Sequence, residues 1–481
     1  MRILTAAIVV LLLGAAAGCV VFRSHSIDAA SQDDVWIGPV TVVVPALHRL
    51  PDRWIHVSRG RVVSIENSLP SGVSAVWSGG FVLPGLIDLH VHFSPRIVPG
   101  SADDFARLFL LHGVTTVREA GSIDGTAYWI RDQVEAGKMA GPRIFSCGPM
   151  LDGDPRLQVF ARVVHDATDA EKSVKLLVDE GADCIKVYEN LSPDSLAAIA
   201  AAARKYGLPV IGHVPRGGSL AEGEIDEVQH VTGILPRPLE AHVANPEWLT
   251  ELARRFREVD EAAIQAYVQA SVDQGIRHTP TLVSFLRDSE QAGYAVNRNS
   301  ASAQLLPRYW RDVLWNAELD ERFRGLTPDT WDALRESLER RQEIVKRLHD
   351  AGVPILTGTD TPNPFVVPGA GIHDELRLLV AAGLTVEDAW VAATHAAGRA
   401  LGDEQLGLIE SGAPADLLWF SEDPTSDLKS LDTLGGVMAD GRLYPIEELR
   451  QASEGRRRQF ESTIYDRLSS MIVRTGSALL R

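Results

Sequence analysis

Two histidines with one residue between them, His90 and His92, end a long apolar run in this chain of 481 residues. On a β-strand, residues two apart point to the same side, so both imidazoles can reach one point in space. Imidazole is the commonest protein ligand for a transition metal. Alone, the pair is equally compatible with two packed or surface histidines, so a metal site depends on the residues that follow.

Further groups with metal-binding or proton-transfer chemistry stand at the ends of later apolar runs: Lys186, His213, His230 and Asp360. Singly, each has a structural explanation, such as a core histidine, a lysine in a buried ion pair or an aspartate that caps a helix. In a parallel α/β barrel, however, catalytic groups lie together at the C-terminal ends of the strands. Taken with the first two histidines, these residues therefore predict one site for metal ions.

Lys186 decides between one metal ion and two. A protonated amine is repelled by a cation, whereas a neutral amine can react with carbon dioxide to give an anionic, bidentate carbamate. Bound cations dominate the local charge and would favour that anion. A carboxylated Lys186 would bridge two divalent ions, for which we expect zinc, at the roughly 3.5–4 Å spacing of two-metal hydrolytic sites.

The alternation of apolar runs and helical patterns indicates the fold class that must position these groups. From residue 81 onward the predicted strands are 81–90, 114–118, 143–147, 183–188, 208–213, 227–230, 276–283 and 353–359. Strands that alternate with helices predict a parallel α/β fold, and eight of them predict a closed (β/α)8 barrel of the TIM type. An open doubly wound sheet is the alternative, although the chain lacks a dinucleotide-binding fingerprint.

The segments on either side of this pattern show strand patterns without intervening helices. Residues 33–80 and 405–445 show short alternating strands, and neither piece can bury a core alone. We predict that they form one small β-sandwich beside a barrel at 81–404. A helical insertion at about 285–347 is either a lid or an extra layer whose tryptophans are core. The tail, 446–481, is a predicted helix whose basic run at 456–458 indicates a solvated face.

Residues 1–22 predict export. Arg2 precedes an apolar segment that ends in small residues, which is the pattern of a secretory signal. Residues 16–19 (AAGC) resemble a lipoprotein cleavage box with Cys19 as the lipidated residue, and an uncleaved membrane anchor is the alternative. We expect a periplasmic or cell-envelope protein that meets the membrane only through this segment. Cys147 and Cys184 lie in or at the ends of predicted buried strands and are predicted to be free thiols.

The charge balance restricts the partners. The chain has 64 acidic and 47 basic residues, which gives a formal net charge of −17. Binding to nucleic acid needs a basic surface, so we do not expect nucleic acid as a partner. A small-molecule substrate is the expected ligand.

The chain resembles the metal-dependent amidohydrolase superfamily over roughly residues 35–444, in its imidazolonepropionase-like branch, which contains Xaa-Pro dipeptidases. The motifs that carry the resemblance are residues 83–92 (LPGLIDLHVH), 113–118 (GVTTVR), 181–186 (GADCIK), 358–360 (GTD), 393–394 (AT), 400–402 (ALG) and 412–417 (GAPADL). Glu119, where aspartate is usual, and residues 78–80 (SGG), which replace an acidic lead-in, depart from the family pattern. Neither departure touches an expected metal ligand.

The resemblance implies a barrel with a sandwich and two bound metal ions. It implies that one ion is held by His90, His92, Lys186 and Asp360, and the other by Lys186, His213 and His230. It also implies a hydrolase that uses metal-activated hydroxide against an amide. Asp360 would accept the proton of the water and deliver it to the leaving nitrogen. Tyr188, two residues after Lys186, would donate a hydrogen bond to the developing oxyanion, unless it is a core tyrosine.

The substrate is indicated by the branch and by cations near the strand ends. Enzymes of this branch cleave dipeptides and N-acyl amino acids, so an amide next to a free carboxylate is the first expectation. Arginine can hold a carboxylate bidentately, and the residues we expect to bind substrate with Tyr188 are Arg118, Arg216 and His373, with His165 and Arg237 in similar positions. Each is also compatible with a structural role.

Other activities fit the same site. Esters, lactones and organophosphates are the second expectation, because two metal ions activate water against these bonds as well. A deaminase is disfavoured, since a site with one metal ion would not need Lys186. The non-catalytic alternative is an exported lipoprotein that only binds its ligand.

Overall fold

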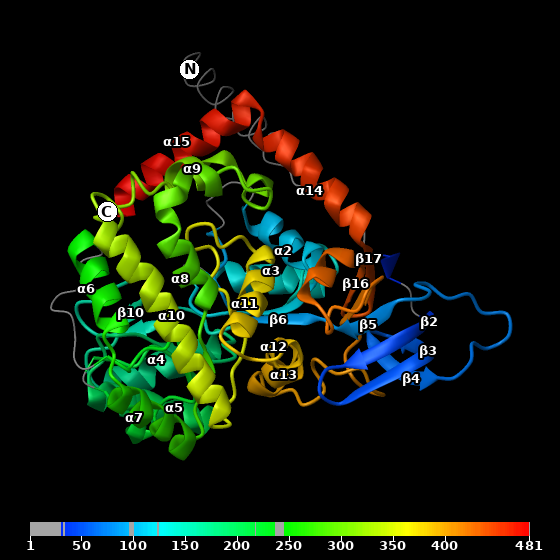
Figure 1. Cartoon of the computed structure of the whole chain (residues 1–481), viewed down its shortest axis with the longest axis horizontal. Helices are drawn as coiled ribbons and strands as arrows, with labels where there is room; N and C mark the ends of the chain where they lie inside the picture. Colours follow the sequence, from blue (N-terminus) through cyan, green and yellow to red (C-terminus); the bar gives the residue numbers. More distant parts are fainter. Residues whose placement is uncertain are drawn as a thin grey trace, which may run out of the picture.

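The computed structural model describes residues 30–31, 34–95, 101–122, 125–216, 218–235 and 245–480. The predicted export segment at 1–22, with Cys19, lies outside the described residues, as does Arg237. In Figure 1, a domain of helices around short strands lies beside an extended sheet.

The parallel α/β prediction is confirmed for the part of the chain that carries the candidate ligands. One parallel sheet has the order β6-β7-β8 and a second has the order β10-β9-β11-β12-β13-β14. Their strands are β6 (Leu86–Val91), β7 (Val114–Glu119), β8 (Arg143–Ser146), β9 (Leu151–Asp152), β10 (Arg162–Val163), β11 (Ile185–Val187), β12 (Val210–Gly212), β13 (Glu227–Gln229) and β14 (Arg277–Thr279). Most residues in these strands are buried, as expected of a sheet covered by helices.

The strands form a TIM-like arrangement whose ladder is not continuous. The predicted strand at 353–359 runs between the two sheets but pairs through isolated bridges only, His278 with Ile355 and Val91 with Thr361. Pro354 has no N–H to donate, and the Thr357 N–H donates to Ala392 O (3.3 Å) rather than to a neighbouring strand. The barrel-like α/β arrangement therefore agrees with the prediction, but the eight strands do not form one closed hydrogen-bonded sheet.

Helices cover the outside of these strands (Figure 1). They are α2 (Ser101–Leu111), α3 (Thr126–Glu135), α4 (Ala167–Asp179), α5 (Pro193–Tyr206), α6 (Pro246–Arg257), α7 (Glu261–Gln274), α11 (Ala370–Ala381), α12 (Val386–Ala392) and α13 (His395–Ala400). α5 shows how the sequence sets such bounds. The Ser192 side chain accepts from the Ser195 N–H at its start, and Gly207 ends it with φ 68°, a conformation that glycine adopts without steric cost.

Both flanks of the chain meet in one mixed sheet of eight strands, in the order β1-β17-β16-β15-β5-β2-β3-β4. The bounds are β1 (Ala30–Ser31), β2 (Asp34–Val44), β3 (His48–Ser58), β4 (Arg61–Glu66), β5 (Phe81–Pro84), β15 (Leu417–Phe420), β16 (Leu434–Ala439) and β17 (Arg442–Pro445). β5 joins the flanks, because it pairs with β2 on one side and with β15 on the other. The predicted strand at 81–90 therefore divides at Gly85 into β5 and β6. The two flanks form one continuous sheet, where the prediction was a sandwich of two facing sheets.

The helical insertion contains α8 (Leu282–Ser289), α9 (Tyr294–Asn297), the π-helical turn η4 (Trp310–Leu314) and α10 (Pro328–Asp350). Trp310 and Trp315 are buried, and their ring centroids lie 5.5 Å from Phe105 and 5.2 Å from Phe365, respectively. These two tryptophans are core residues of a helical layer, which is the second of the two predicted alternatives.

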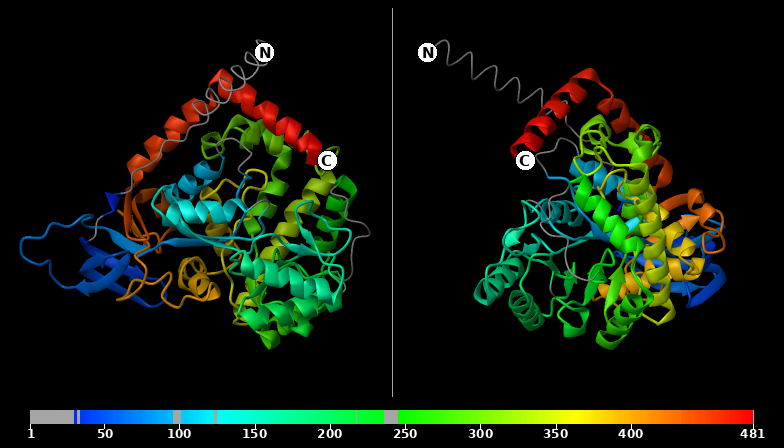
Figure 2. Two further views of the ribbon diagram at one scale, coloured as in Figure 1. Left: turned by 180° about the vertical axis from the view of Figure 1, so that it is seen from behind. Right: turned by 60° about the vertical axis from the view of Figure 1, so that its left-hand side comes forward.

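The tail forms α14 (Ile446–Phe460) and α15 (Thr463–Leu480), which cross one side of the molecule at an angle (Figure 2). Arg456, predicted to lie on a solvated face, is fully buried and forms an ion pair with the buried Asp104 (3.0 Å). The prediction was wrong because α14 packs against α2, which brings the carboxylate of Asp104 to this arginine.

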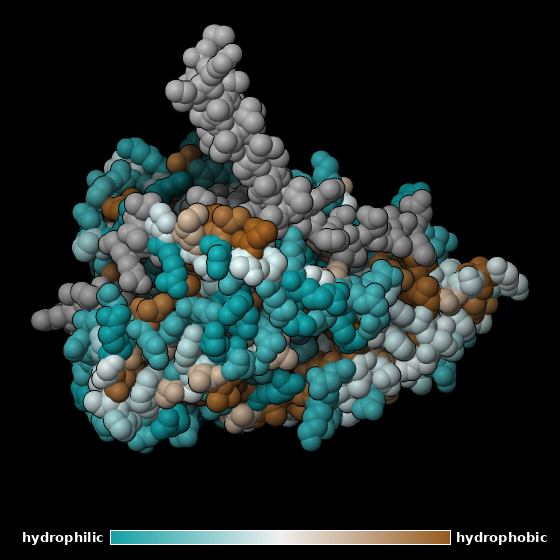
Figure 3. All heavy atoms as spheres, turned by 90° about the horizontal axis from the view of Figure 1, so that it is seen from above, coloured by the Kyte–Doolittle hydropathy of each residue, from teal (hydrophilic) through white to brown (hydrophobic). Residues whose placement is uncertain are grey.

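Ile464 and Met471 on α15 are exposed, and Figure 3 looks down on this side, where hydrophobic patches interrupt a hydrophilic surface. Among the described residues, no helix is both long enough and apolar enough to cross a membrane.

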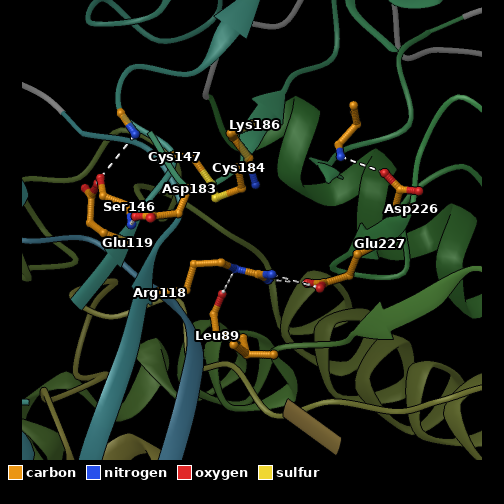
Figure 4. Close-up of a disulfide and its surroundings, with 12 residues drawn as sticks. Leu89, Arg118, Glu119, Ser146, Cys147, Asp183, Cys184, Lys186, Asp226 and Glu227 are labelled. Carbon is orange, nitrogen blue, oxygen red and sulfur yellow. Dashed lines mark hydrogen bonds and ion pairs between the residues drawn. A yellow bond between two sulfur atoms is a disulfide. The ribbon is translucent and has the colours of Figure 1, made fainter. Parts of the chain in front are cut away.

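Cys147 and Cys184 are joined in a disulfide, which corrects the prediction of two free thiols. Cys147 follows β8 and Cys184 precedes β11, and their Cα atoms are 4.5 Å apart (Figure 4). Two hydrogen bonds hold these segments together, from Asp183 N to Ser146 O and from Ser146 N to Asp183 Oδ2 (both 2.8 Å). The sequence places each cysteine at a strand end but does not show that the two strand ends are neighbours.

Candidate active site

His90, His230 and Asp360 form a compact cluster, in which one potential ligand atom from each lies within 4.8 Å of the others. His90 Nε2 lies 3.2 Å from Asp360 Oδ1. The residues come from the end of β6, the residue after β13 and the segment that follows the bridge at Ile355. Three groups far apart in sequence thus converge on one point, as the positions at strand ends predicted.

His92 joins the same cluster. Its Nε2 atom lies 3.3 Å from Asp360 Oδ1 and 3.2 Å from His90 Nε2. Its Nδ1 atom faces Gly121 O at 3.1 Å, and a carbonyl only accepts hydrogen bonds, so Nδ1 carries the proton. The lone pair of Nε2 therefore points at the cluster, the arrangement found in histidines that bind metals.

Asp360 is positioned by β6, the strand that carries His90. Asp88 accepts hydrogen bonds from Thr359 N (3.0 Å) and Thr359 Oγ1 (2.7 Å), and Asp360 N donates to His90 O (2.7 Å). Gly358 permits this close approach, because a Cβ there would lie 2.8 Å from His90 Cβ. The last residues of the predicted eighth strand are thus held directly against the histidine pair.

Backbone strain gathers at this cluster. His230 and Asp360 both have φ 61°, in the left-handed region that non-glycine residues seldom adopt. Thr281, whose Oγ1 lies 2.6 Å from His230 Nδ1, has φ 52°. Such conformations persist where the surrounding structure holds a functional side chain in place.

Lys186 lies at the centre of β11, paired with Ile211 of β12, and its side chain is 1% exposed. Its amine donates to Gln229 Oε1 from the end of β13. Burial lowers the pKa of Lys186 to about 7, so a large fraction of the amine is neutral near physiological pH. A neutral, buried amine beside four histidines is the form that formation of a carbamate needs.

His213 and Tyr188 form the other side of the site. The His213 ring lies 4.8 Å from His230 and 4.2 Å from Tyr188, measured between centroids. Glu189 Oε1 lies 3.1 Å from His213 Nδ1 and fixes the orientation of that ring. Burial raises the pKa of Tyr188 well above its ordinary value, so its hydroxyl remains a hydrogen-bond donor.

The pKa shifts of His90, His230 and Asp360 match the protonation of metal ligands, whereas at His92 burial lowers the pKa less than the neighbouring Asp360 raises it, so its net shift is upward. Burial lowers the pKa of His90 to about 3 and that of His230 well below its ordinary value, so both rings are neutral at pH 7. Burial alone would raise the pKa of Asp360, but the imidazoles of His90 and His230 bring it well below its ordinary value. Neutral imidazoles and an ionised carboxylate are the states in which these groups bind cations.

A cavity of about 890 Å³ lies against this cluster. His90, His92, Lys186, His213, His230 and Asp360 all line it, as do Tyr188 and Arg216. Its other wall comes from α6, α8 and α10, and includes Trp248, Phe256, Phe285 and Arg341. The helical insertion therefore covers the cavity with side chains as well as forming a core layer.

Two predicted substrate-binding residues lie away from the cavity. Arg118 is 1% exposed and forms a bidentate ion pair with Glu227, with Arg118 Nη1 2.9 Å from Glu227 Oε2 (Figure 4). His373 Nε2 lies 2.9 Å from His112 O, and burial lowers the pKa of His373 to about 3. We therefore no longer expect Arg118 or His373 to bind substrate, because each is committed to a contact inside the protein.

The remaining candidates differ in position. Arg216 lines the cavity, but its Nη2 atom is 3.2 Å from Glu189 Oε2. His165 is exposed in the segment before α4.

The structure adds residues that the sequence did not indicate. Gln229, Glu189 and Thr281 contact Lys186, His213 and His230, respectively. Gln229 and Glu189 are each within three residues of a proposed ligand, and that nearness was a usable signal. Thr281 is 51 residues from His230, so only the folded chain shows the pair.

Comparisons with known proteins identify the family of the chain. A sequence profile of the Amidohydrolase family matches residues 81–444. Adenine deaminase 2 from Rhizobium meliloti (strain 1021) is 27% identical over 76% of this chain, and the match spans 49% of that enzyme's length.

Two solved structures share the fold. Bottromycin amidohydrolase superposes with a TM-score of 0.70 over 90% of this chain and 92% of its own, at 23% identity. A Xaa-Pro dipeptidase with bound methionine in its active site superposes with a TM-score of 0.62 over 86% of this chain and 100% of its own, at 21% identity. The two structures confirm the fold, and the match of the family profile over residues 81–444 confirms the resemblance that the sequence motifs carry.

Proposed function

The chain belongs to the amidohydrolase family, and on that premise we propose that it hydrolyses an amide C–N bond in a dipeptide or an N-acyl amino acid. The observation that carries the proposal is the convergence of His90, His230 and Asp360 within 4.8 Å, at the edge of a large cavity. A buried lysine and two further histidines at the same edge support a centre with two metal ions.

The residues fit two divalent cations, which we propose are zinc. His90, His92 and Asp360 would hold one ion, since their Nε2 and Oδ1 atoms already approach one point. His213 and His230 would hold the second, and Lys186, as a carbamate, would bridge both. When bound, such a pair of cations lowers the pKa of water and polarises a carbonyl group.

Asp360 is the group that we assign to proton transfer. Asn363 Nδ2 donates to Asp360 Oδ2 at 2.6 Å and orients the carboxylate. Asp360 would take the proton from the attacking water and later release it to the leaving nitrogen. Tyr188, with its hydroxyl protonated, would donate a hydrogen bond to the negative charge that develops on the carbonyl oxygen.

The kind of substrate is supported by the cavity and by the names of related structures. The cavity is lined by the candidate metal ligands and also by aromatic side chains and arginines. Bottromycin amidohydrolase and the Xaa-Pro dipeptidase, whose folds match, are named for action on an amide and on a dipeptide, respectively. An amide with a free carboxylate nearby suits these features better than a purine does.

Replacing Lys186 with Met should remove the bridge between the two metal ions. We expect the wild-type protein, supplied with zinc and bicarbonate, to hold about two ions per chain. The variant should hold fewer and lose at least about 100-fold in kcat/KM. Elemental analysis and assays with N-acyl amino acids and dipeptides measure both quantities. Lys175→Met is the matched control, because Lys175 is exposed and forms an ion pair with Asp179 on the surface of α4.

Results with other substrates in the same assay could contradict the proposal. Turnover of lactones or phosphotriesters without turnover of amides would assign the site to the second class of reaction. Release of ammonia from adenine would indicate a deaminase. Wild-type protein that binds no metal and hydrolyses none of these compounds would contradict a catalytic role.

We also propose that the chain is exported and anchored through a lipid on Cys19. The disulfide between Cys147 and Cys184 supports this location, because disulfides persist in oxidising compartments and are rare in the cytosol.

Deleting residues 1–22 should keep the protein in the cytosol with Cys147 and Cys184 reduced. The two cysteines are separated by 37 positions in the sequence, so loss of the disulfide should lower the free energy of unfolding by about 2–4 kcal/mol. Alkylation of free thiols in intact cells, followed by mass spectrometry, compares the deletion variant with the full chain. Free thiols in the full chain would argue against export, and reoxidation of the purified variant should restore its stability.

A further inference from the structure

Four arginines line the cavity, and one of them differs from the others in its ion pairing. Three have a carboxylate partner: Arg216 with Glu189 (3.2 Å), Arg255 with Glu251 (2.7 Å) and Arg322 with Asp320 (2.8 Å). Arg341, on α10, has no carboxylate within 4.0 Å among the residues that the structure describes, although its side chain is only 2% exposed. Asp288 acts on it electrostatically but lies beyond that distance.

The Arg341 guanidinium lies between two aromatic rings. Its Cζ atom is 3.4 Å from the ring centre of Phe256 on α6 and 3.8 Å from that of Phe285 on α8. The ring faces stabilise the cation without using its N–H groups. Nη1 donates to Ser337 O (3.2 Å), while the buried Nε finds no hydrogen-bond partner in the described part of the chain. Nη2 forms no hydrogen bond within the described residues, and Arg341 lines the cavity, so this side of the guanidinium is available to an acceptor that enters.

A buried cation without an ionic partner is costly, so its presence at a cavity wall needs an explanation. Burial lowers the pKa of Arg341 to about 9, which still leaves it charged at pH 7. A carboxylate that enters with the substrate would supply the missing charge and two well-directed acceptors.

The position of Arg341 suits an amide whose carbonyl is at the metal ligands. Phe285 is close both to the candidate metal ligands and to Arg341. Its ring centroid is 6.3 Å from that of His230 and 3.8 Å from Arg341 Cζ. In an N-acyl amino acid, three bonds separate the scissile carbonyl carbon from the carboxylate carbon, a span of about 4 Å. A charge-assisted hydrogen bond of about 2.8 Å then reaches the guanidinium.

We propose that Arg341 binds the carboxylate of the substrate and that the substrate is an N-acyl derivative of an apolar amino acid. This inference rests on the proposed amide hydrolysis. Trp248, Leu252, Phe256 and Phe285 line the same cavity as Arg341 and offer an apolar environment for the side chain next to that carboxylate. Arg341 is thus a specificity-determining residue, and it takes the role that the sequence had suggested for Arg118.

The test compares an acid with its uncharged analogue. Wild-type protein loaded with zinc should hydrolyse N-acetyl-L-leucine with a kcat/KM at least about 100-fold above that for N-acetyl-L-leucinamide. Arg341→Met should remove this preference by reducing hydrolysis of the acid about 100-fold, mainly through KM, while the carboxamide changes less than about 3-fold. Arg341→Lys should recover part of the preference, because it keeps the charge without the bidentate fork.

Arg340→Met is the matched control. Arg340 is the neighbouring residue on α10, but it contacts Val259 O and Glu343 instead of lining the cavity. This variant should keep the preference for the acid. Equal losses on both substrates in Arg341→Met would indicate a structural role, and a wild-type protein without the preference would also overturn the inference.

A binding measurement separates this inference from the proposed function. If neither compound is hydrolysed, amide hydrolysis fails, and calorimetry with N-acetyl-L-leucine still tests Arg341. Binding by the wild type that is lost in Arg341→Met, with no binding of the carboxamide by either, would support the carboxylate site. An absence of binding to the wild type would overturn it.

Discussion

Replacing Asp360 with Asn should lower kcat by at least about 1,000-fold while leaving the fold intact. The amide oxygen of asparagine can still face His90 and His92, but the amide group cannot take a proton from water. General acid–base catalysis contributes about 100- to 10,000-fold, and a group that serves in both directions should fall at the high end. Steady-state kinetics on the best amide substrate measure the loss.

Metal content decides how that loss is interpreted. Asp360→Asn should retain at least one ion per chain, because His90, His92, His213 and His230 are unchanged. Asp179→Asn, at an exposed carboxylate on α4, is the control and should behave like the wild type. An Asp360→Asn variant that binds both metal ions and turns over at the wild-type rate would rule out the proton-transfer role.

The largest expected effect on stability comes from the buried ion pair beneath the site. Arg118 and Glu227 lie 109 residues apart in sequence, are 1% and 0% exposed, and meet through two hydrogen bonds. Arg118 Nε also donates to Leu89 O (3.0 Å), and Thr279 Oγ1 donates to Glu227 Oε1 (2.6 Å). The pair therefore ties β6, β7, β13 and β14 together inside the ring of strands.

Arg118→Met should lower the free energy of unfolding by about 3–5 kcal/mol, because it leaves the Glu227 carboxylate buried without its partner. Denaturation in urea, followed by circular dichroism, measures this change. The double variant Arg118→Met, Glu227→Met should be more stable than Arg118→Met alone, since it removes both charges. If the two single losses simply add in the double variant, the ion pair is not coupled as the structure indicates.

Much of the candidate site could be predicted from local patterns. The alternation of side chains on a strand places His90 and His92 on one side, and an apolar run that ends in a polar group marks a strand end. Because parallel strands of one barrel end at the same face, His213, His230 and Asp360 could be assigned to one site without knowing the strand order. The predicted strand at 353–359 was predicted less well, since the segment meets its neighbours only through isolated bridges at Ile355 and Thr361, and the Thr357 N–H donates to Ala392 O.

Arginines show most clearly what local patterns could not determine. Arg118 stands at the end of a predicted strand, and Arg456 stands in a basic run typical of a solvated helix. Both are nevertheless buried against carboxylates from distant segments. Arg341 stands in a long polar helix with nothing in its neighbourhood to suggest a cavity. Its surroundings, Phe256 and Phe285, come from two other helices.

The amino-acid order thus determined which side chains stand at strand ends, and so the chemistry of the centre, because the periods of strands and helices are local properties of the chain. The tertiary structure alone decided which distant residues became partners: Cys147 with Cys184, Arg118 with Glu227, and Arg341 with two phenylalanines. Partnership depends on how strands and helices pack side by side. That packing is set by the sum of many weak contacts across the whole core rather than by any pattern within one segment.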